Sequence, residues 1–208
     1  MSTLGELITA ISNRLLDQNG VAVSSSSITE AINDSIKYYK HKTFYFNQEF
    51  TTFTVASGSS TLASFPTDFL AFGKGGMAIQ YSQQKWPLRV VTPSEFDLED
   101  IEGTGLPYIV TKRGSSWYIY YKPDQTYTIQ IHYLKDYTAL SSSSDTNDFT
   151  TIGETLIRND ALSRLYAEFR QDEKMEAYFT ARADTEYQNL TGISNLQLET
   201  GCLEVDQL

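Results

Sequence analysis

The chain has 208 residues, of which 16 are basic and 26 acidic, and its formal net charge is −10 at pH 7. Proteins that hold nucleic acid tightly gain affinity from the counterions that Lys and Arg release, so this balance disfavours tight binding of DNA or RNA. The single cysteine, Cys202, excludes an intrachain disulfide framework and a cysteine-based zinc site. The N-terminal sequence lacks a signal-peptide pattern, and no segment approaches the ~18 apolar residues of a membrane span. We therefore expect a soluble protein made in the cytoplasm.

Two helices are predicted at the start of the chain. Apolar residues recur at helical spacing from Thr3 to Gln18, and Asn19-Gly20 ends this first helix. The segment Ser27-Ile28-Thr29-Glu30 has the capping-box pattern, in which a hydroxyl and a carboxylate accept hydrogen bonds from backbone N–H groups. This pattern predicts the beginning of a second helix, which runs towards Phe44.

The apolar period changes to two between about residues 46 and 137, where β-branched and aromatic residues become frequent and turns recur. The run Phe50 to Val55 and the returning run Thr61 to Phe65 flank the turn sequence Ser57-Gly58-Ser59-Ser60. The pattern predicts an antiparallel β domain, which we assign to residues 47–150.

A dense aromatic stretch, "GLPYIVTKRGSSWYIYYKPDQTYTIQIHY", fills residues 105–133. Turn residues divide it into the runs Pro107–Lys112, Trp117–Tyr121 and Tyr127–Tyr133. Three short runs joined by tight turns are typical of a three-stranded meander.

The last two of these runs differ in their faces. Alternation predicts that the third run buries one face, made of Tyr127, Ile129, Ile131 and Tyr133. The middle run is apolar on both faces, because Tyr118 and Tyr120 point away from Trp117. Three interpretations stay open for its second face: cover from another element of this chain, a surface on which sugars or bases stack, or a subunit interface.

Helical spacing returns from Leu156 to Phe169, and a further helix begins near Gln171-Asp172-Glu173 and continues to Leu190. Helices gain most of their stability from packing, so neither the N-terminal nor the C-terminal pair can bury its apolar stripe alone. We therefore predict an α+β fold, in which residues 1–46 and 151–190 form one discontinuous four-helix domain with the β domain inserted.

The remaining residues, 191–208, are predicted to form an extended C-terminal arm, because their apolar residues follow no sustained period. Six aliphatic residues are spaced among polar ones: Ile193, Leu196, Leu198, Leu203, Val205 and Leu208. Such an arm docks on another subunit by adding a strand to a sheet or by lying in a groove. The alternative is a frayed terminus.

The residues able to carry chemistry form no catalytic constellation. His41 and His132 lack sequence neighbours at metal-ligand or catalytic-triad spacing. The acidic cluster from Glu95 to Glu102 does not match a calcium loop and is interpreted as a solvated surface. The sequence therefore predicts no enzyme, no cofactor and no metal ion.

Residues 4–190 resemble the head-to-tail adaptor (connector) proteins of tailed bacteriophages, and are most similar to adaptors of short-tailed phages. The resemblance depends on two motifs in particular, Phe65-Pro66-x-Asp68-Phe69 and Pro123-Asp124-x-x-Tyr127-x-Ile129-x-Ile131-x-Tyr133. It also includes the segments "GLPYIV" and "SWYIYYKPDQTYTIQIHYLKDYTALS" and the final helix pair.

This resemblance implies a structural virion protein that is assembled in the host cytoplasm and has no membrane partner. Family adaptors form a ring, usually dodecameric, that joins the portal to the next tail component, a nozzle or tail tube, and extends the channel through which genomic DNA passes without tight binding. The expected partner-binding residues are Trp117, Tyr118, Tyr120 and the six aliphatic residues of the arm. The alternative is a carbohydrate-binding or tail-associated β module that uses exposed Tyr and Trp.

Overall fold

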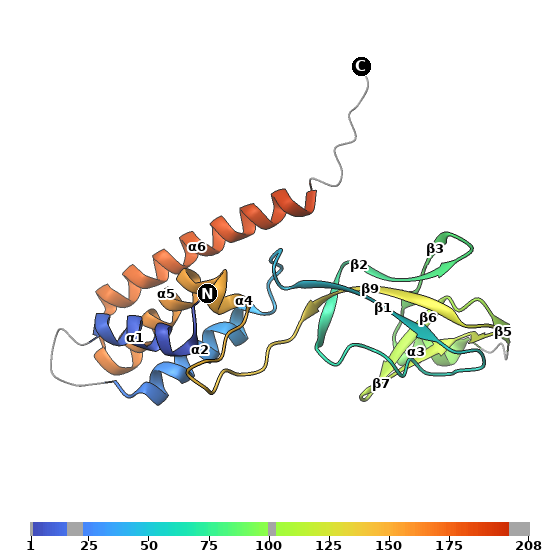
Figure 1. The fold of residues 1–208 in the computed structure, drawn as a ribbon, viewed down its shortest axis with the longest axis horizontal. Coiled ribbons are helices and arrows are strands. Elements are labelled where there is room, and N and C mark those ends of the chain that lie inside the picture. The colour runs from blue at the N-terminus through green and yellow to red at the C-terminus, as the bar shows by residue number, and fades with distance from the viewer. Residues whose placement is uncertain (1, 16–22, 100–102, 200–208) are drawn as a thin grey trace, which may run out of the picture. The chain divides into compact units, whose positions relative to one another are not determined.

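A computed structural model describes residues 2–15, 23–99 and 103–199, and within these ranges the chain is α+β (Figure 1). The chain divides into two compact units. The helical unit contains the residues up to Asn47 and those from Asp136 onward, and the β unit contains Gln48–Lys135. The β unit therefore interrupts the helical unit in sequence.

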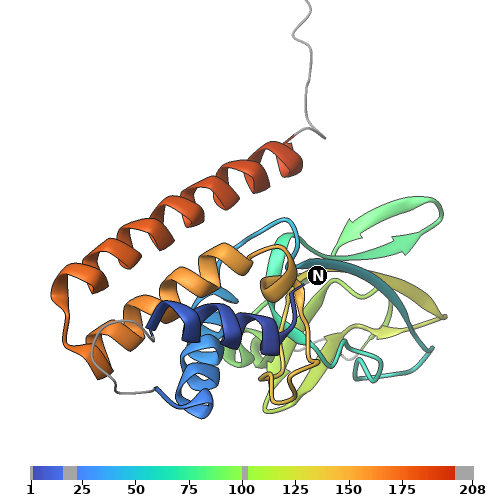
Figure 2. The ribbon, with the colours of Figure 1, turned by 60° about the vertical axis from the view of Figure 1, so that its left-hand side comes forward.

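Within its described residues, the helical unit contains five α-helices: α1 Leu4–Leu15, α2 Ser25–Tyr39, α4 Asp148–Thr151, α5 Glu154–Leu165 and α6 Glu173–Glu199 (Figures 1 and 2). A π-helical turn, Tyr166–Arg170, follows α5 directly. Gln171 then takes a left-handed backbone with φ of 49°, which ends this turn before α6 begins.

One core joins the helices from both ends of the chain. Leu7 and Ile11 of α1 and Ile32 of α2 are fully buried, together with Leu156 and Leu162 of α5. Phe179 and Ala183 of α6 belong to the same cluster. The N-terminal and C-terminal helices therefore supply the apolar surface that each set lacks alone.

The predicted end of the β region at residue 150 is wrong, because residues 136–150 pack with the helices. Leu140 and Phe149 lie in the helical core. The backbone N–H groups of Leu4 and Gly5 donate to the carbonyls of Asp145 and Ser143, which fixes this segment at the start of α1.

The beginning of α2 also differs from the prediction. Ser24 is the N-cap, and its hydroxyl accepts a hydrogen bond from the backbone N–H of Ser27 at 3.1 Å. Because the serine-rich loop offers this earlier acceptor, the helix begins before the predicted capping box at Ser27 and Glu30. The predicted end of the first helix at Asn19-Gly20 lies outside the described residues.

The part of the β unit that the structure describes contains one helix, α3 Pro93–Leu98, and nine strands: β1 Gln48–Val55, β2 Phe69–Tyr81, β3 Gln84–Pro87, β4 Arg89–Val90, β5 Thr104–Gly105, β6 Ile109–Arg113, β7 Ser116–Tyr120, β8 Lys122–Pro123 and β9 Tyr127–Lys135. The largest sheet has the order β1-β9-β2-β3 and is antiparallel. The others are β4-β6-β7 and β5-β8, and the pairs β4·β6 and β5·β8 are parallel.

The predicted meander is half correct. Strands β6 and β7 form the expected antiparallel pair, but β9 pairs with β1 and β2 in the other sheet. Between them, Lys122 and Pro123 pair with β5, so the chain leaves the β6–β7 sheet before β9 begins. The returning run Thr61 to Phe65 forms no strand: β1 pairs with β9 along its whole length, and Thr61 alone forms a bridge, to Tyr118.

The apolar core of the β unit lies between these sheets. The predicted buried face of β9 is confirmed: Tyr127, Ile129, Ile131 and Tyr133 are all buried. Trp117 and Ile119 of β7 belong to the same core cluster. The aromatic stretch therefore contributes strands to two sheets that share one core.

Candidate interaction surface

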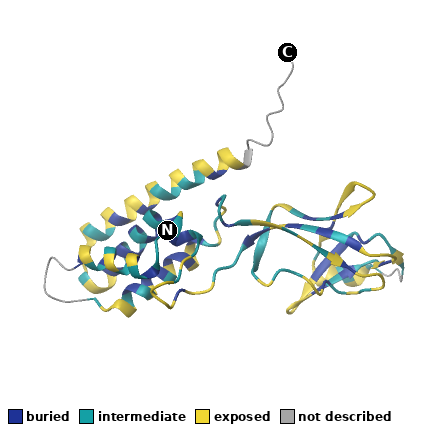
Figure 3. Cartoon of the chain, in the orientation of Figure 1, coloured by how far each residue is buried: buried dark blue, intermediate teal, exposed yellow. Residues whose placement is uncertain are grey.

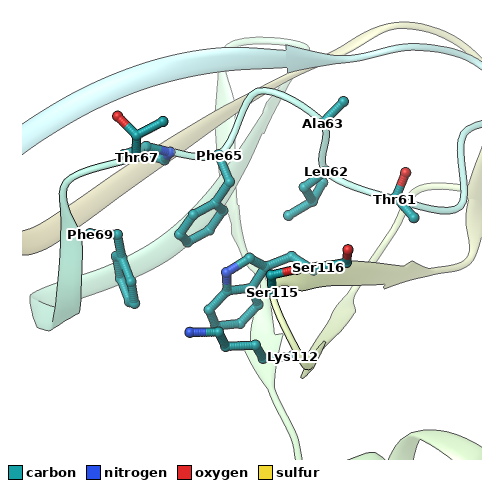
Figure 4. Close-up of a pocket in the computed structure, with 11 residues that line it drawn as sticks. Thr61, Leu62, Ala63, Phe65, Thr67, Phe69, Lys112, Ser115 and Ser116 are labelled. Atoms are coloured by element: carbon teal, nitrogen blue, oxygen red, sulfur yellow. The ribbon is translucent and has the colours of Figure 1, made fainter.

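An aromatic cavity of about 440 Å³ opens beside β7 in the β unit (Figure 4). Phe65 comes from the segment before β2, Phe69 is the first residue of β2, and Lys112 and Trp117 come from β6 and β7. The described lining residues are Thr61, Leu62, Ala63, Phe65, Pro66, Thr67, Phe69, Lys112, Ser115, Ser116 and Trp117. The walls therefore combine aromatic and aliphatic side chains with hydroxyl groups and the Lys112 ammonium.

The tryptophan of this cavity is held on several sides. Phe65 stacks on Trp117 with ring centroids 4.7 Å apart and an interplanar angle of 18°. Phe69 meets Trp117 edge-on at 5.8 Å, and Phe72 does so at 5.4 Å. With 6% exposure, Trp117 is largely covered by its own chain, and the part of its surface that remains forms a wall of the cavity.

A hydrogen bond fixes the segment that carries Phe65 and Phe69. The hydroxyl of Tyr133 on β9 donates to the Asp68 carboxylate at 2.9 Å. Burial, followed by this bond and the charge of Asp68, raises the pKa of Tyr133 above its ordinary value. In the second motif, Tyr127 donates to Asp124 at 2.5 Å, which closes the turn before β9.

Among the described residues that line the cavity, Lys112 alone is charged. Its ammonium lies 5.8 Å from the centroid of the Trp117 ring, which is within cation–π range. Among the described residues, none of the carboxylates lies within ion-pair distance of Lys112. The neighbouring Arg113 differs, because it is paired with Asp97. The cavity therefore combines aromatic walls with a cation that has no such partner.

The second face of β7 is covered in part by α3. The Phe96 ring meets Tyr120 edge-on at 5.7 Å, and the Arg113 guanidinium lies over both Phe96 and Tyr118, at 5.2 and 5.6 Å. A capping box between Thr92 and Glu95 fixes the start of α3. Tyr118 and Tyr120 remain half-buried, so an element of this chain provides part of the cover that the sequence left open.

Tyr108, beside this cover, also takes part in its hydrogen bonding. Its hydroxyl donates to the Glu99 carboxylate at 3.0 Å. Burial and the bonded, negatively charged Glu99 raise the pKa of Tyr108 to about 12. The acidic residues of this segment that the structure describes are therefore local partners, as Glu95, Asp97 and Glu99 each contact a neighbouring side chain.

The C-terminal segment differs from the predicted extended arm, because α6 continues through residues 191–199. Ser194 is fully buried, and its hydroxyl accepts a hydrogen bond from the backbone N–H of Tyr45 at 3.0 Å. The sequence analysis ended this helix at Leu190 because the next buried residue on its packed face, Ser194, is polar and does not continue the apolar pattern. Ile193 and Leu196 are exposed, at 44% and 70%. The side chain of Leu198 is not described, and Leu203, Val205 and Leu208 lie outside the described residues.

The β2–β3 hairpin is an exposed surface that the sequence did not single out. It projects from the β unit in Figures 1 and 2 and is largely exposed in Figure 3, and it presents Tyr81 and Trp86. The chain carries Lys74, Lys85 and Arg89 but no acidic residue between Asp68 and Glu95. In a chain with so many acidic residues, this long segment without Asp or Glu could have been used to predict a surface of different charge.

No group of three or more His, Cys, Asp or Glu side chains among the described residues is arranged to hold a metal ion. None of the helices within the described ranges is long and apolar enough to cross a membrane.

Comparison with known proteins gives the family. No curated protein matches the chain. The family model described as SU10 adaptor protein matches residues 2–200, almost the entire sequence. That family is structural and is not a known enzyme family. The chain therefore belongs to the SU10 adaptor protein family, a head-to-tail adaptor family of short-tailed phages.

Proposed function

We propose that the protein forms a ring, with twelve copies as the expected number, that joins the portal of the virion to the next tail component and extends the DNA channel. The observation that carries the proposal is the match to an adaptor family over residues 2–200. A phage structural adaptor needs contacts to copies of itself and to neighbours above and below it. The described surface offers such contacts on both units.

The end of α6 is one candidate contact surface. Ile193 and Leu196 are exposed there, although the same helix buries Phe179, Ala183 and Ser194 against its own unit. Exposed aliphatic groups gain free energy when a partner covers them, about 1.5–3 kcal/mol each when fully buried. We assign this end of α6, together with the residues after it, to docking on the portal or on an adjacent subunit.

The β2–β3 hairpin is a second candidate contact surface. Its exposed Trp86 and Tyr81 are of the residue types enriched in interfaces. Its cations, Lys74 and Lys85, complement the acidic remainder of the chain. We assign the hairpin to contacts between subunits of the ring.

The charge of the chain fits a conduit for DNA. Twelve copies, each with a net charge of −10, carry about −120 together, a field that repels phosphates and leaves a passing duplex unheld. We therefore expect negligible affinity for duplex DNA at physiological salt. A gel-shift titration checks this expectation, and submicromolar binding that weakens steeply with salt contradicts the conduit role.

The alternative, a carbohydrate-binding module, has less support from the geometry. A sugar needs an open aromatic face on which to stack, but Phe65 covers one face of Trp117 and the side chain is 6% exposed. Trp86 is exposed, but it lies on a projecting hairpin strand and not in the cavity.

Mixing the protein with its portal tests the proposed function. One chain has a mass of 23.5 kDa. We expect light scattering behind size exclusion to show a mass gain of about twelve chains per portal ring. A glycan-binding monomer that leaves the portal mass unchanged would contradict the proposal and favour the alternative.

A further inference from the structure

We propose that the aromatic cavity of the β unit receives the segment Leu203-Glu204-Val205-Asp206 from a second copy of the chain. The inference rests on the proposed homo-oligomer and names a contact within it. The segment lies outside the described residues, so its assignment depends on its sequence and on the cavity.

The apolar side chains of the segment fit the cavity. In an extended chain, Leu203 and Val205 project to the same side about 7 Å apart. The cavity, at about 440 Å³, is large enough for two aliphatic side chains. Phe65, Phe69 and Trp117 pack against one another, so these side chains lie over the aromatic cluster rather than between its rings. These walls are already assembled, since Phe65 is stacked on Trp117 and Asp68 is bonded to Tyr133. Docking therefore needs little rearrangement of the cavity.

The charges are also complementary. Residues 199–208 contain Glu199, Glu204 and Asp206 and no basic residue. Lys112 is the only charged group in the cavity lining and has no described carboxylate within ion-pair distance. Each acidic residue of the segment is adjacent in sequence to an aliphatic one. When the aliphatic side chains bind in the cavity, a carboxylate therefore lies near Lys112. An acidic, aliphatic peptide is therefore the ligand class that both features favour.

A peptide titration on the full-length chain tests this contact without requiring a ring. The receptor carries Trp86→Phe, which leaves Trp117 as the only tryptophan of the two in the sequence. It also carries Leu203→Asp and Val205→Asp, so that its own segment does not compete. The probe is an amidated peptide of residues 199–208, and tryptophan fluorescence reports on the cavity wall.

We expect a saturable change in Trp117 emission on addition of the peptide. Lys112→Glu in the receptor should weaken binding about tenfold or more, because it places like charges together. Lys122→Glu, an exposed residue of the same unit outside the cavity lining, should leave the affinity within about twofold. The peptide with Leu203→Asp and Val205→Asp should not bind. Ala63→Phe, which fills the cavity from its lining, provides a second variant that leaves Lys112 in place.

Three outcomes would overturn the inference: no saturable change up to about 1 mM peptide, equal effects of Lys112→Glu and Lys122→Glu, or binding that survives Ala63→Phe. Circular dichroism of each receptor shows whether it is folded. If a full-length chain that carries Trp86→Phe and keeps its own segment binds that segment within one monomer, light scattering of that chain reports a single-chain mass while Trp117 emission is already shifted, and the second-copy assignment is wrong. A portal that still gains adaptor mass while the peptide fails to bind separates this failure from a failure of the proposed function.

Discussion

Tyr133 donates a hydrogen bond to the carboxylate of Asp68 across 2.9 Å. Tyr133 lies on β9 and is buried, whereas Asp68 directly precedes β2. The bond thus joins the largest sheet of the β unit to the segment that carries Phe65 and Phe69. Its two partners belong to the two sequence motifs that resemble the adaptor family, so the motifs meet in one contact that supports the aromatic cavity.

Tyr133→Phe removes this hydrogen bond but keeps the ring in the core. We expect the free energy of unfolding to fall by about 1–2 kcal/mol, since the bond has a charged acceptor and its donor is buried. Chemical denaturation measures the change. The matched control is Tyr118→Phe in the same unit, since the hydroxyl of Tyr118 makes no hydrogen bond within the described residues. Equal effects of the two substitutions would show that the bond to Asp68 contributes nothing.

Alkaline pH should destabilise the protein through its buried tyrosines. Burial, followed by the charges of Asp160 and Asp184, raises the pKa of Tyr39, and burial with the Asp68 bond raises that of Tyr133. Because the pKa of these tyrosines is higher in the folded than in the unfolded chain, the free energy of unfolding is fully retained below their unfolded pKa of about 10. Stability is then lost as the pH rises further, because only the unfolded chain ionises readily.

Denaturation between about pH 8 and 11 checks this expectation. The unfolding free energy should be nearly level up to about pH 10 and then decrease. Tyr39→Phe should have a shallower alkaline decrease, with a small effect at neutral pH. An identical pH dependence in the variant and the wild type would show that the pKa of Tyr39 is not raised in the folded protein.

Adjacent aromatic residues on α6 test which face of that helix is packed. Phe179 is buried and stacks on Tyr166 with centroids 5.4 Å apart, whereas Tyr178 is 50% exposed. We expect Phe179→Ala to cost about 3–5 kcal/mol of unfolding free energy and Tyr178→Ala less than about 1 kcal/mol. A reversed order in thermal or chemical unfolding would contradict the packing of α6.

Removal of the β unit tests the independence of the helical unit. Asn47 and Asp136 are the residues of the helical unit at its two junctions with the β unit. The Asn47 side chain donates to the Lys40 carbonyl at 3.4 Å, and the Lys40 ammonium binds Asp136 at 2.6 Å, so both junctions are anchored at Lys40. Replacing residues 48–135 with a short Gly/Ser linker should leave a folded helical protein. Residues 1–47 alone should be largely unfolded, because their core partners lie on α5 and α6. Circular dichroism distinguishes these results, and strong helicity in the short fragment would contradict the shared core.

The sequence predicted the elements whose pattern is local. The alternation of Tyr127, Ile129, Ile131 and Tyr133 specifies one buried face whichever strand lies alongside, and that face is buried as expected. Partner strands were not predictable from the same pattern. The pairing of β9 with β1 spans the whole β unit, whereas turn residues near Pro123 favoured a local hairpin.

The candidate surfaces show the same limit. Trp117 was predicted as a partner-binding residue, which stays a prediction, but its burial depends on Phe65 and Phe69, which lie some fifty residues earlier in the chain. The continuation of α6 includes Ser194, whose hydroxyl accepts a hydrogen bond from the backbone N–H of the distant Tyr45. The lack of a sustained apolar period suggested an extended arm, because a local sequence pattern contains no information about such long-range contacts.

The central claim, a ring that joins the portal to the tail, is tested most directly by cryo-electron microscopy of the protein bound to its portal. We expect a closed ring of twelve adaptor chains on the tail-facing end of the portal, with an open axial channel. Monomers scattered on the portal surface, or an absence of adaptor density beneath it, would show that the protein forms no such ring.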